Sequence, residues 1–180
     1  MVSKSYQPLG NNLCYYSDAD FASNDDRVSV SGALHFLNNN LVSWNSSKQR
    51  SVATSTCESE LNALRGVVLA NMAARDFLNE LGLGNKAATK VYVDNAAAID
   101  VANGSSHSST LKHVLVSIAK IREQVREKNV TLRFVNSRSN LADLMTKPLK
   151  KVRFQLLRDA IMKQSTESLY QCAARCRRIS

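Results

Sequence analysis

The chain has 180 residues, 44% of them hydrophobic, with 24 basic and 15 acidic residues and a formal net charge of +9. This length suits one well-packed domain, and the hydrophobic content excludes a wholly disordered chain. The amino terminus has no apolar signal core, and no segment is long enough to cross a bilayer. We therefore expect an intracellular protein, cytoplasmic or nuclear, that is not secreted and has no membrane partner.

The positive charge gathers at the carboxyl end, where residues 147–180 contain nine basic and two acidic residues. Such a segment either contacts the phosphates of a nucleic acid or extends as solvated chain, and charge alone leaves both alternatives open. The four cysteines lack the spacing of a zinc site, which predicts free thiols. We expect a flexible segment at 1–12, a folded domain at 13–162 and a basic, disordered tail at 163–180.

The amino-terminal part of this domain predicts three strands and a long helix. A β-prone run at 13–17 stops at Asp18, a second run at 28–37 alternates in polarity, and a third at 41–44 follows three asparagines that favour a tight turn. Three consecutive strands predict an antiparallel meander. Apolar residues at helical spacing then predict a helix over 57–81.

Strands and helices alternate in the rest of the domain. The predicted elements are a strand at 89–94, helices at 95–103 and 111–129, a strand at 130–135, and helices that begin near 141 and 152. This alternation predicts that the later strands join the sheet in parallel. We therefore expect a mixed α/β fold, with a five-stranded mixed sheet and helices on both faces.

Four acidic residues lie at the edges of apolar segments, namely Asp18, Glu60, Asp94 and Asp143. If the first and fourth strands are neighbours, two of these carboxylates lie at one edge of the sheet, and helix starts packed over that edge can add the other two. Converging carboxylates repel one another unless a cation lies between them, and Mg²⁺ prefers oxygen ligands. The four residues therefore predict a metal site of the two-metal nuclease type.

Each of these acids also has a purely structural interpretation. Asp18 can begin a turn, Glu60 can sit in a helix first turn, Asp94 can cap the next helix, and Asp143 can be an exposed acid at a helix start. We favour the shared site because four such coincidences are less expected together than singly. Glu58 competes with Glu60, since residues two apart on a helix point in nearly opposite directions, and we prefer Glu60 because it borders the buried stripe.

Several blocks together resemble the ribonuclease H domain of copia-type retrotransposon Pol polyproteins, a domain of the reverse transcriptase/ribonuclease H family. The blocks occur in the family's order over about residues 13–162, and they are residues 16–64 (YSDADF to SELNAL), VYVDNAAAI, LKHVLVSIAKIREQV, NLADLMTKPL and FQLLRDAIM. The resemblance implies the ribonuclease H fold and Mg²⁺-dependent hydrolysis of the RNA strand of an RNA–DNA hybrid.

The same resemblance assigns roles to individual residues. It implies two Mg²⁺ ions, replaceable by Mn²⁺, held by the catalytic residues Asp18, Glu60, Asp94 and Asp143. Its implied partners are an RNA–DNA hybrid and a reverse transcriptase domain in the parent polyprotein.

Three further residues are predicted to contact the substrate. Lys48 can hold a phosphate, Asn95 can contact a ribose 2′-OH, and His113 can assist proton transfer or product release. By default, Lys48 and Asn95 are ordinary surface residues, and a lone histidine on a helix is more often structural.

The chain also departs from the family pattern. Leu115, Ser117, Ala119 and Ala96 stand where family members carry polar side chains. A catalytically decayed domain that binds nucleic acid is therefore an alternative to the active endoribonuclease. A DNA strand transferase of the same superfamily is a third hypothesis, which the LADLMTKPL block disfavours. No segment resembles a reverse transcriptase, integrase or protease, so we expect a Pol-derived fragment.

Overall fold

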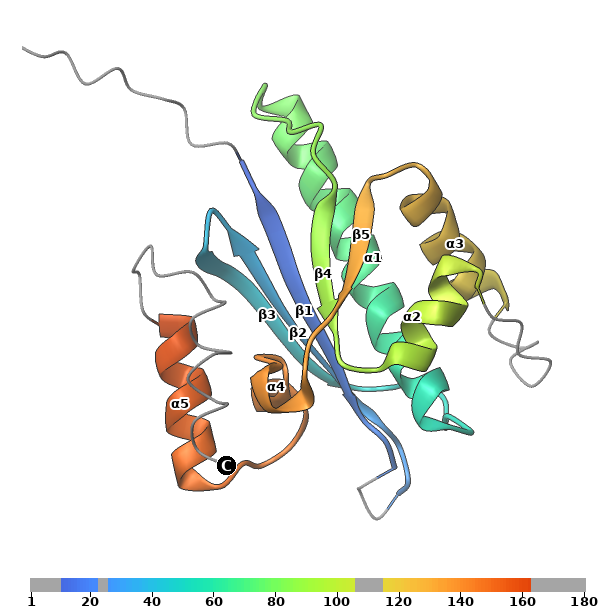
Figure 1. Ribbon diagram of the computed structural model, residues 1–180, viewed down its shortest axis with the longest axis vertical. Helices are drawn as coiled ribbons and strands as arrows, with labels where there is room; N and C mark the ends of the chain where they lie inside the picture. The colour runs from blue at the N-terminus through green and yellow to red at the C-terminus, as the bar shows by residue number, and fades with distance from the viewer. Residues whose placement is uncertain (1–10, 23–25, 106–114, 163–180) are drawn as a thin grey trace, which may run out of the picture.

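A computed structural model describes residues 11–22, 26–105 and 115–162 of the chain, with the side chains of 115–117 excluded. Five strands form one sheet in the order β3-β2-β1-β4-β5 (Figure 1). They are β1 (Leu13–Asp20), β2 (Val30–Leu37), β3 (Asn40–Lys48), β4 (Thr89–Val93) and β5 (Val130–Phe134). The first three strands pair antiparallel, β4 lies parallel to β1, and β5 lies parallel to β4. The predicted meander with parallel additions is confirmed.

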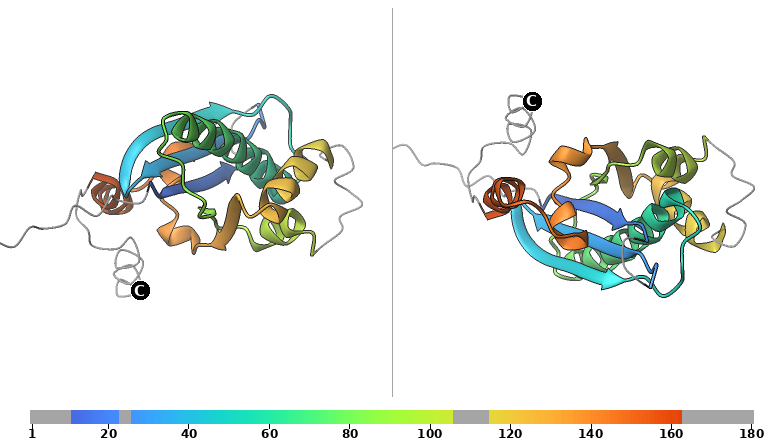
Figure 2. Two further views of the ribbon diagram at one scale, coloured as in Figure 1. Left: turned by 90° about the horizontal axis from the view of Figure 1, so that it is seen from above. Right: turned by 90° about the horizontal axis from the view of Figure 1, so that it is seen from below.

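Helices cover both faces of this sheet, as predicted (Figure 2). The long α1 (Thr56–Glu80), α2 (Ala96–Asn103) and α3 (Leu115–Arg126) pack on one face. The other face carries the short α4 (Asp143–Thr146) and α5 (Lys151–Met162), and the 3-10 helix η2 (Ser137–Ser139) leads into α4. None of the described helices is both long and apolar enough to cross a membrane.

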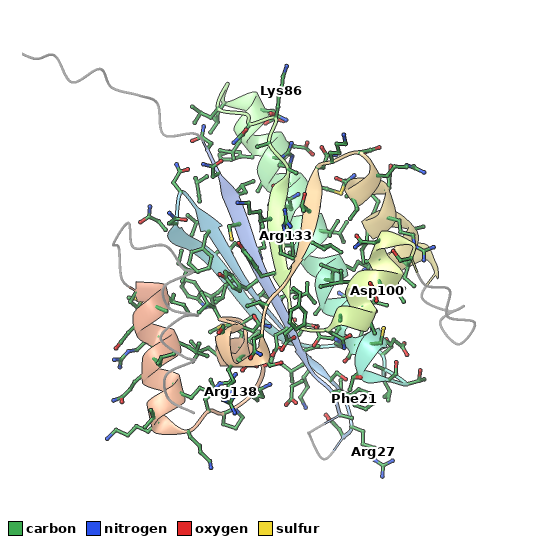
Figure 3. The ribbon with its side chains drawn as sticks, viewed as in Figure 1. Phe21, Arg27, Lys86, Asp100, Arg133 and Arg138 are labelled. Atoms are coloured by element: carbon green, nitrogen blue, oxygen red, sulfur yellow. The ribbon has the colours of Figure 1, made fainter. Side chains whose placement is uncertain are left out.

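The alternation of side chains along β1 separates two hydrophobic cores. Tyr15 packs against α1, α2 and α3, whereas Tyr16 packs with Leu157 of α5 on the opposite face. The ring of Tyr16 also stacks on Tyr92 of β4, with 4.8 Å between the ring centres. Arg133 of β5, the register partner of Tyr92, lies exposed (Figure 3). The sheet thus forms the central layer between the two cores.

Two strands extend further than the sequence pattern predicts. The first strand does not stop at Asp18, because β2 continues to pair with it, placing Asp18 opposite Gly32 and Asp20 opposite Val30. Pairing with β2 likewise carries β3 through polar residues to Lys48. The turn between β2 and β3 does follow the prediction, since Asn38 and Asn39 take the positive φ angles that asparagine tolerates.

Some predictions fall on parts of the chain that the structure does not describe. Of the helix predicted at 111–129, α3 begins at Leu115, and residues 111–114, which include His113, lie outside the described residues. The predicted tail at 163–180 and most of the predicted segment at 1–12 also lie outside them.

Candidate active site

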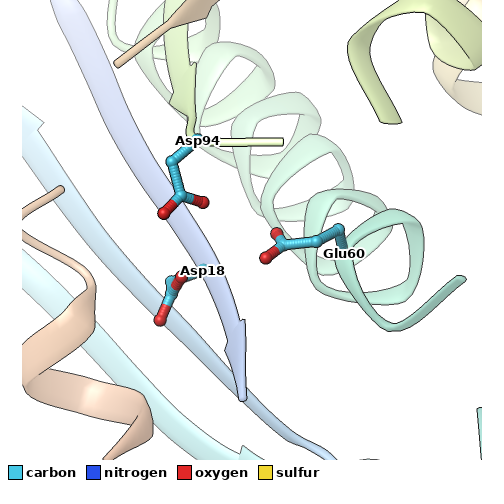
Figure 4. Close-up of side chains that lie close together, drawn as sticks. All are labelled: Asp18, Glu60 and Asp94. Atoms are coloured by element: carbon cyan, nitrogen blue, oxygen red, sulfur yellow. The ribbon is translucent and has the colours of Figure 1, made fainter. Parts of the chain in front are cut away.

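Three of the predicted acids come together at one edge of the sheet. Asp18 lies within β1, Asp94 directly follows β4, and Glu60 lies near the start of α1. Each residue offers one carboxylate oxygen, and these three atoms all lie within 4.8 Å of one another (Figure 4). Tyr16 of β1 pairs with Tyr92 of β4 in parallel register. Asp18 and Asp94 each lie two residues after the paired tyrosine of their strand, so they are brought to the same level of the sheet. Packing of α1 on β1 then brings in Glu60.

Burial of this cluster makes its negative charge costly. Asp18 and Glu60 are only 2% and 6% exposed. Burial, and then the charges of Asp18 and Asp94, raise the pKa of Glu60 to about 9. Burial also raises the pKa of Asp18, against the opposing effects of a hydrogen bond from Thr146 and the charge of Lys147. A cation between the carboxylates would remove this repulsion.

The cluster also fits a divalent metal by its chemistry. All three side chains offer carboxylate oxygens, the ligands that Mg²⁺ and Mn²⁺ prefer. Glu60 Oε1 accepts a hydrogen bond from the backbone N–H of Ala19 at 3.3 Å. Glu60 Oε2 is buried and accepts no hydrogen bond from any residue that the structure describes. A buried oxygen without a donor is well suited to be a metal ligand.

Glu58 has a different function at the start of α1. The hydroxyl of Ser55, the N-cap residue, accepts a hydrogen bond from the N–H of Glu58 at 3.1 Å. The carboxylate of Glu58 reaches back and accepts hydrogen bonds from the N–H and the hydroxyl of Thr54, both at 2.7 Å. These bonds satisfy groups at the helix terminus and close a capping arrangement. Glu60, one half-turn further on, is the glutamate that lies beside Asp18 and Asp94.

Asp143, the fourth predicted acid, lies outside the group of three but next to it. Its side chain is fully buried at the start of α4. The ammonium of Lys147 lies 2.7 Å from Asp143 Oδ1 and 4.0 Å from Asp18 Oδ2, so it bridges the two carboxylates. The other oxygen of Asp143 forms an ion pair with Arg153 of α5. The fourth acid is thus neutralised by two basic side chains.

Two hydrogen bonds attach α4 to β1 at the position of Asp18. The hydroxyl of Thr146 donates to Asp18 Oδ2. The buried amide of Asn140 donates to the carbonyl of Ser17 at 3.0 Å, while its oxygen accepts from the N–H of Ala142 at 3.2 Å. These bonds hold the start of α4 and the central acid of the cluster in one rigid unit.

Close packing of α4 on the sheet depends on Gly32, the cross-strand neighbour of Asp18. A Cβ atom at Gly32 would lie 2.6 Å from Cγ2 of Thr146 and 2.9 Å from the carbonyl oxygen of Ala142. Both distances are shorter than van der Waals contact. The absence of a side chain at this position therefore allows α4 to approach the carboxylate cluster.

The structure describes two of the three residues that were predicted to contact the substrate. Lys48, at the exposed end of β3, forms an ion pair with Asp26 at 2.6 Å. Asn95 is the N-cap of α2, and its side-chain oxygen accepts a hydrogen bond from the N–H of Ala98 at 3.0 Å. The alternative that Asp94 caps this helix is therefore wrong. His113 lies outside the described residues, and the substrate roles of all three remain predictions.

Sequence reasoning overlooked the residues that support the acids: Gly32, Asn140, Thr146, Lys147 and Arg153. Some of these residues could have been identified from the sequence. Thr146 and Lys147 belong to the LADLMTKPL block, and Asn140 lies two residues before the N–H group it binds, a spacing typical of an Asx turn. Gly32 and Arg153 could not, because their contacts depend on how distant segments pack.

Glu60→Gln is expected to raise the melting temperature of the metal-free protein at pH 8 by several degrees. With a folded-state pKa of about 9, above its ordinary 4.5, Glu60 keeps a proton in the folded protein that the unfolded chain has released. Its contribution to stability is present below about pH 4.5 and is lost as the pH rises toward 9. Glutamine does not ionise, so the variant should lack this dependence.

Thermal melts in EDTA from pH 5 to pH 9 would measure this difference, with Glu80→Gln as the control because Glu80 is exposed at the other end of α1. Parallel pH profiles for the parent and Glu60→Gln would show that Glu60 is ionised in the folded, metal-free protein.

The chain is similar in sequence to Pol polyproteins of plant transposons. The retrovirus-related Pol polyprotein from transposon RE2 of Arabidopsis thaliana is 34% identical over 149 residues, and that from transposon TNT 1-94 of Nicotiana tabacum is 33% identical over 147 residues. The two alignments each cover 81% of this chain, but 10% and 11% of the relatives. The chain thus spans about a tenth of the length of the curated relatives it matches. No protein-family model matches it.

Solved structures with a similar fold include ribonucleases H. LC11 ribonuclease H1, crystallised with an RNA/DNA hybrid, matches with a TM-score of 0.56 at 19% identity, over 75% of this chain and 94% of that one. The amino-terminal ribonuclease H domain of a Mycobacterium tuberculosis protein matches with a TM-score of 0.55 at 12% identity, over 83% and 98%. These similarities establish the fold. Sequence and fold together show that the chain is a domain with the ribonuclease H fold and a homologue of one segment of the retrovirus-related Pol polyproteins of copia-type transposons.

Proposed function

We propose that this domain is a metal-dependent endoribonuclease that cleaves the RNA strand of RNA–DNA hybrids. The observation that carries the proposal is the convergence of Asp18, Glu60 and Asp94 within 4.8 Å, two of them buried. Such a cluster can be fully ionised only at high electrostatic cost unless it binds cations, and the fold is shared with a ribonuclease H1 crystallised with an RNA/DNA hybrid. A nuclease site explains both features.

The carboxylates would hold two divalent cations, Mg²⁺ or in its place Mn²⁺. Asp18, Glu60 and Asp94 supply oxygen ligands from three different elements, and Asp143 is held on the other side of Asp18. When bound, such ions activate a water molecule and stabilise the negative charge that develops at a phosphate under attack.

Hydrogen bonds within the chain hold the carboxylates in position. Asp18 is fixed by its β-strand and by the hydroxyl of Thr146, and Glu60 by the N–H of Ala19. Because these bonds are already formed, the carboxylates need little rearrangement when cations and substrate arrive. The buried position of Asp18 and Glu60 also limits the water that competes for the ligand oxygens.

Substrate binding is proposed to involve the three residues that the sequence predicts for it. Asn95 adjoins Asp94 and is our candidate for a ribose 2′-OH, with its amide nitrogen as donor because its oxygen caps α2. Lys48 would exchange Asp26 for a phosphate, a small change because an ion pair this exposed is weakened by the surrounding water. We propose His113 for product release, and a reverse transcriptase segment of the parent polyprotein as the partner that helps hold the hybrid.

A cleavage assay tests the proposed function. Purified protein with millimolar Mg²⁺ should cut end-labelled RNA in an RNA–DNA hybrid and leave duplex DNA intact, and EDTA should stop the reaction. Binding of the hybrid without cleavage in either Mg²⁺ or Mn²⁺ would instead support the decayed nucleic-acid-binding domain. Cutting of duplex DNA would support the strand transferase.

A further inference from the structure

Asp143 is bound by two basic side chains whose surroundings differ. One oxygen, Oδ2, pairs with the guanidinium of Arg153, and the other, Oδ1, lies 2.7 Å from the ammonium of Lys147. The carboxylate is fully buried, while the two basic side chains are 34% and 37% exposed. A buried carboxylate requires such partners, but the two need not have the same role.

Arg153 is held between several segments. Its Nη2 group contacts Asp143 at the start of α4 and also donates to the carbonyl of Ser137 in η2 at 2.6 Å. Arg153 lies on α5, and Leu157, one turn further along that helix, is fully buried in the second core. A guanidinium that binds two segments from an anchored helix is a fixed partner, because its planar set of donors suits several acceptors at once.

Lys147 is bound more loosely. It follows α4 and precedes Pro148, in extended backbone with φ −149° and ψ 154°. Its ammonium, at the end of a flexible four-carbon stem, lies between Asp143 Oδ1 and Asp18 Oδ2, at 2.7 Å and 4.0 Å. A point between two carboxylates also attracts a divalent cation, and a third of the lysine side chain already faces solvent.

We propose that Arg153 is a positioning residue for Asp143 and that Lys147 is a displaceable counter-ion. Arg153 keeps Asp143 Oδ2, so that Oδ1 faces Asp18. Lys147 neutralises Asp18 and Asp143 in the metal-free protein and swings into solvent when a divalent cation takes its place. This inference rests on the proposed function, because it requires that the acids bind metal.

The two side chains should therefore affect metal affinity in opposite directions. Lys147→Gln removes a competitor and should tighten Mn²⁺ binding about tenfold, which corresponds to about 1.4 kcal/mol. Arg153→Gln releases the orientation of Asp143 and should weaken binding about tenfold, as loss of a partner behind a metal ligand commonly does. If both side chains acted only through their charge, removing either would strengthen cation binding.

Calorimetric titration of MnCl₂ into the metal-free 180-residue chain measures these affinities without any activity assay. Arg158→Gln is the matched control, because Arg158 is exposed on the same helix and pairs with Asp159, so its loss removes the same charge without touching the site. Thermal melts in EDTA give a second readout. Lys147→Gln should melt below the parent without metal and show a larger rise when Mn²⁺ is added.

Opposite shifts for Lys147→Gln and Arg153→Gln, with Arg158→Gln unchanged, would support the proposal. Shifts in the same direction, or none, in variants that still bind Mn²⁺ would overturn it and leave the proposed function standing. Absence of Mn²⁺ binding in every variant and in the parent would overturn both. If Arg153→Gln does not fold, Arg153→Lys keeps the charge but loses the paired donors, and it too should bind Mn²⁺ more weakly than the parent.

Discussion

Asp94→Asn should reduce cleavage of the hybrid by about 1,000-fold or more, a loss of about 4 kcal/mol in transition-state stabilisation. The amide that replaces the carboxylate is a weaker metal ligand and carries no charge, so the site should lose most of its affinity for cations. The same change should raise the melting temperature of the metal-free protein. Asp94 lies beside two buried acids, and its charge raises the pKa of both Asp18 and Glu60.

This pairing of lost activity with gained stability distinguishes a metal ligand from a structural residue. The control is Asp100→Asn, because Asp100 is exposed on α2, a few residues along the chain (Figure 3). It loses the same charge and should keep its activity and its melting temperature. Cleavage rates and thermal melts in EDTA, measured for both variants and the parent, distinguish the two roles of Asp94. A destabilised Asp94→Asn would show that Asp94 supports the fold, and a fully active one would remove it from the site.

Gly32→Ala should destabilise the protein by about 1–3 kcal/mol, the usual range for overfilling a packed site. The added methyl group would meet Thr146 and the backbone of Ala142 at distances below 3.0 Å, so α4 must move away from the sheet. That movement would withdraw Thr146 from Asp18 and carry Asp143 with it. Cleavage should therefore fall even though no acidic residue has changed.

Gly66→Ala provides the matched control for this substitution. Gly66 lies in the middle of α1, and a Cβ atom there meets nothing within 4 Å. Alanine is the better helix former, so this variant should gain about 0.5–1 kcal/mol. Urea unfolding and the hybrid-cleavage assay measure both effects. If Gly32→Ala is as stable and as active as the parent, α4 is not held to Asp18 by close packing at this position.

Much of the fold followed from local patterns in the sequence. Alternating polarity and turn residues predicted the strands, and helical spacing predicted α1, because these patterns are properties of short segments. The ends of strands were less predictable. β1 and β3 extend through polar residues because β2 supplies hydrogen-bond partners, and that support comes from another segment.

The choice between Glu58 and Glu60 depends partly on local pattern and partly on packing between distant segments. The spacing of Ser55 and Glu58 is that of a capping box, a local pattern that accounts for Glu58 from sequence alone. Helix geometry then leaves Glu60 to point elsewhere. That it meets Asp18 and Asp94 is a result of how α1 packs on β1, which the helical pattern does not specify.

Residue type and near-neighbour spacing were thus enough to predict which elements form, their order, and the acids that could share a site. The use of Asp143 depends instead on how the elements pack. Its partner Arg153 belongs to a different helix, and Lys147 reaches Asp18, more than a hundred residues earlier in the chain. Gly32 likewise matters only because α4 folds back onto β2. Contacts of this kind arise from packing between distant segments, and no local pattern encodes them.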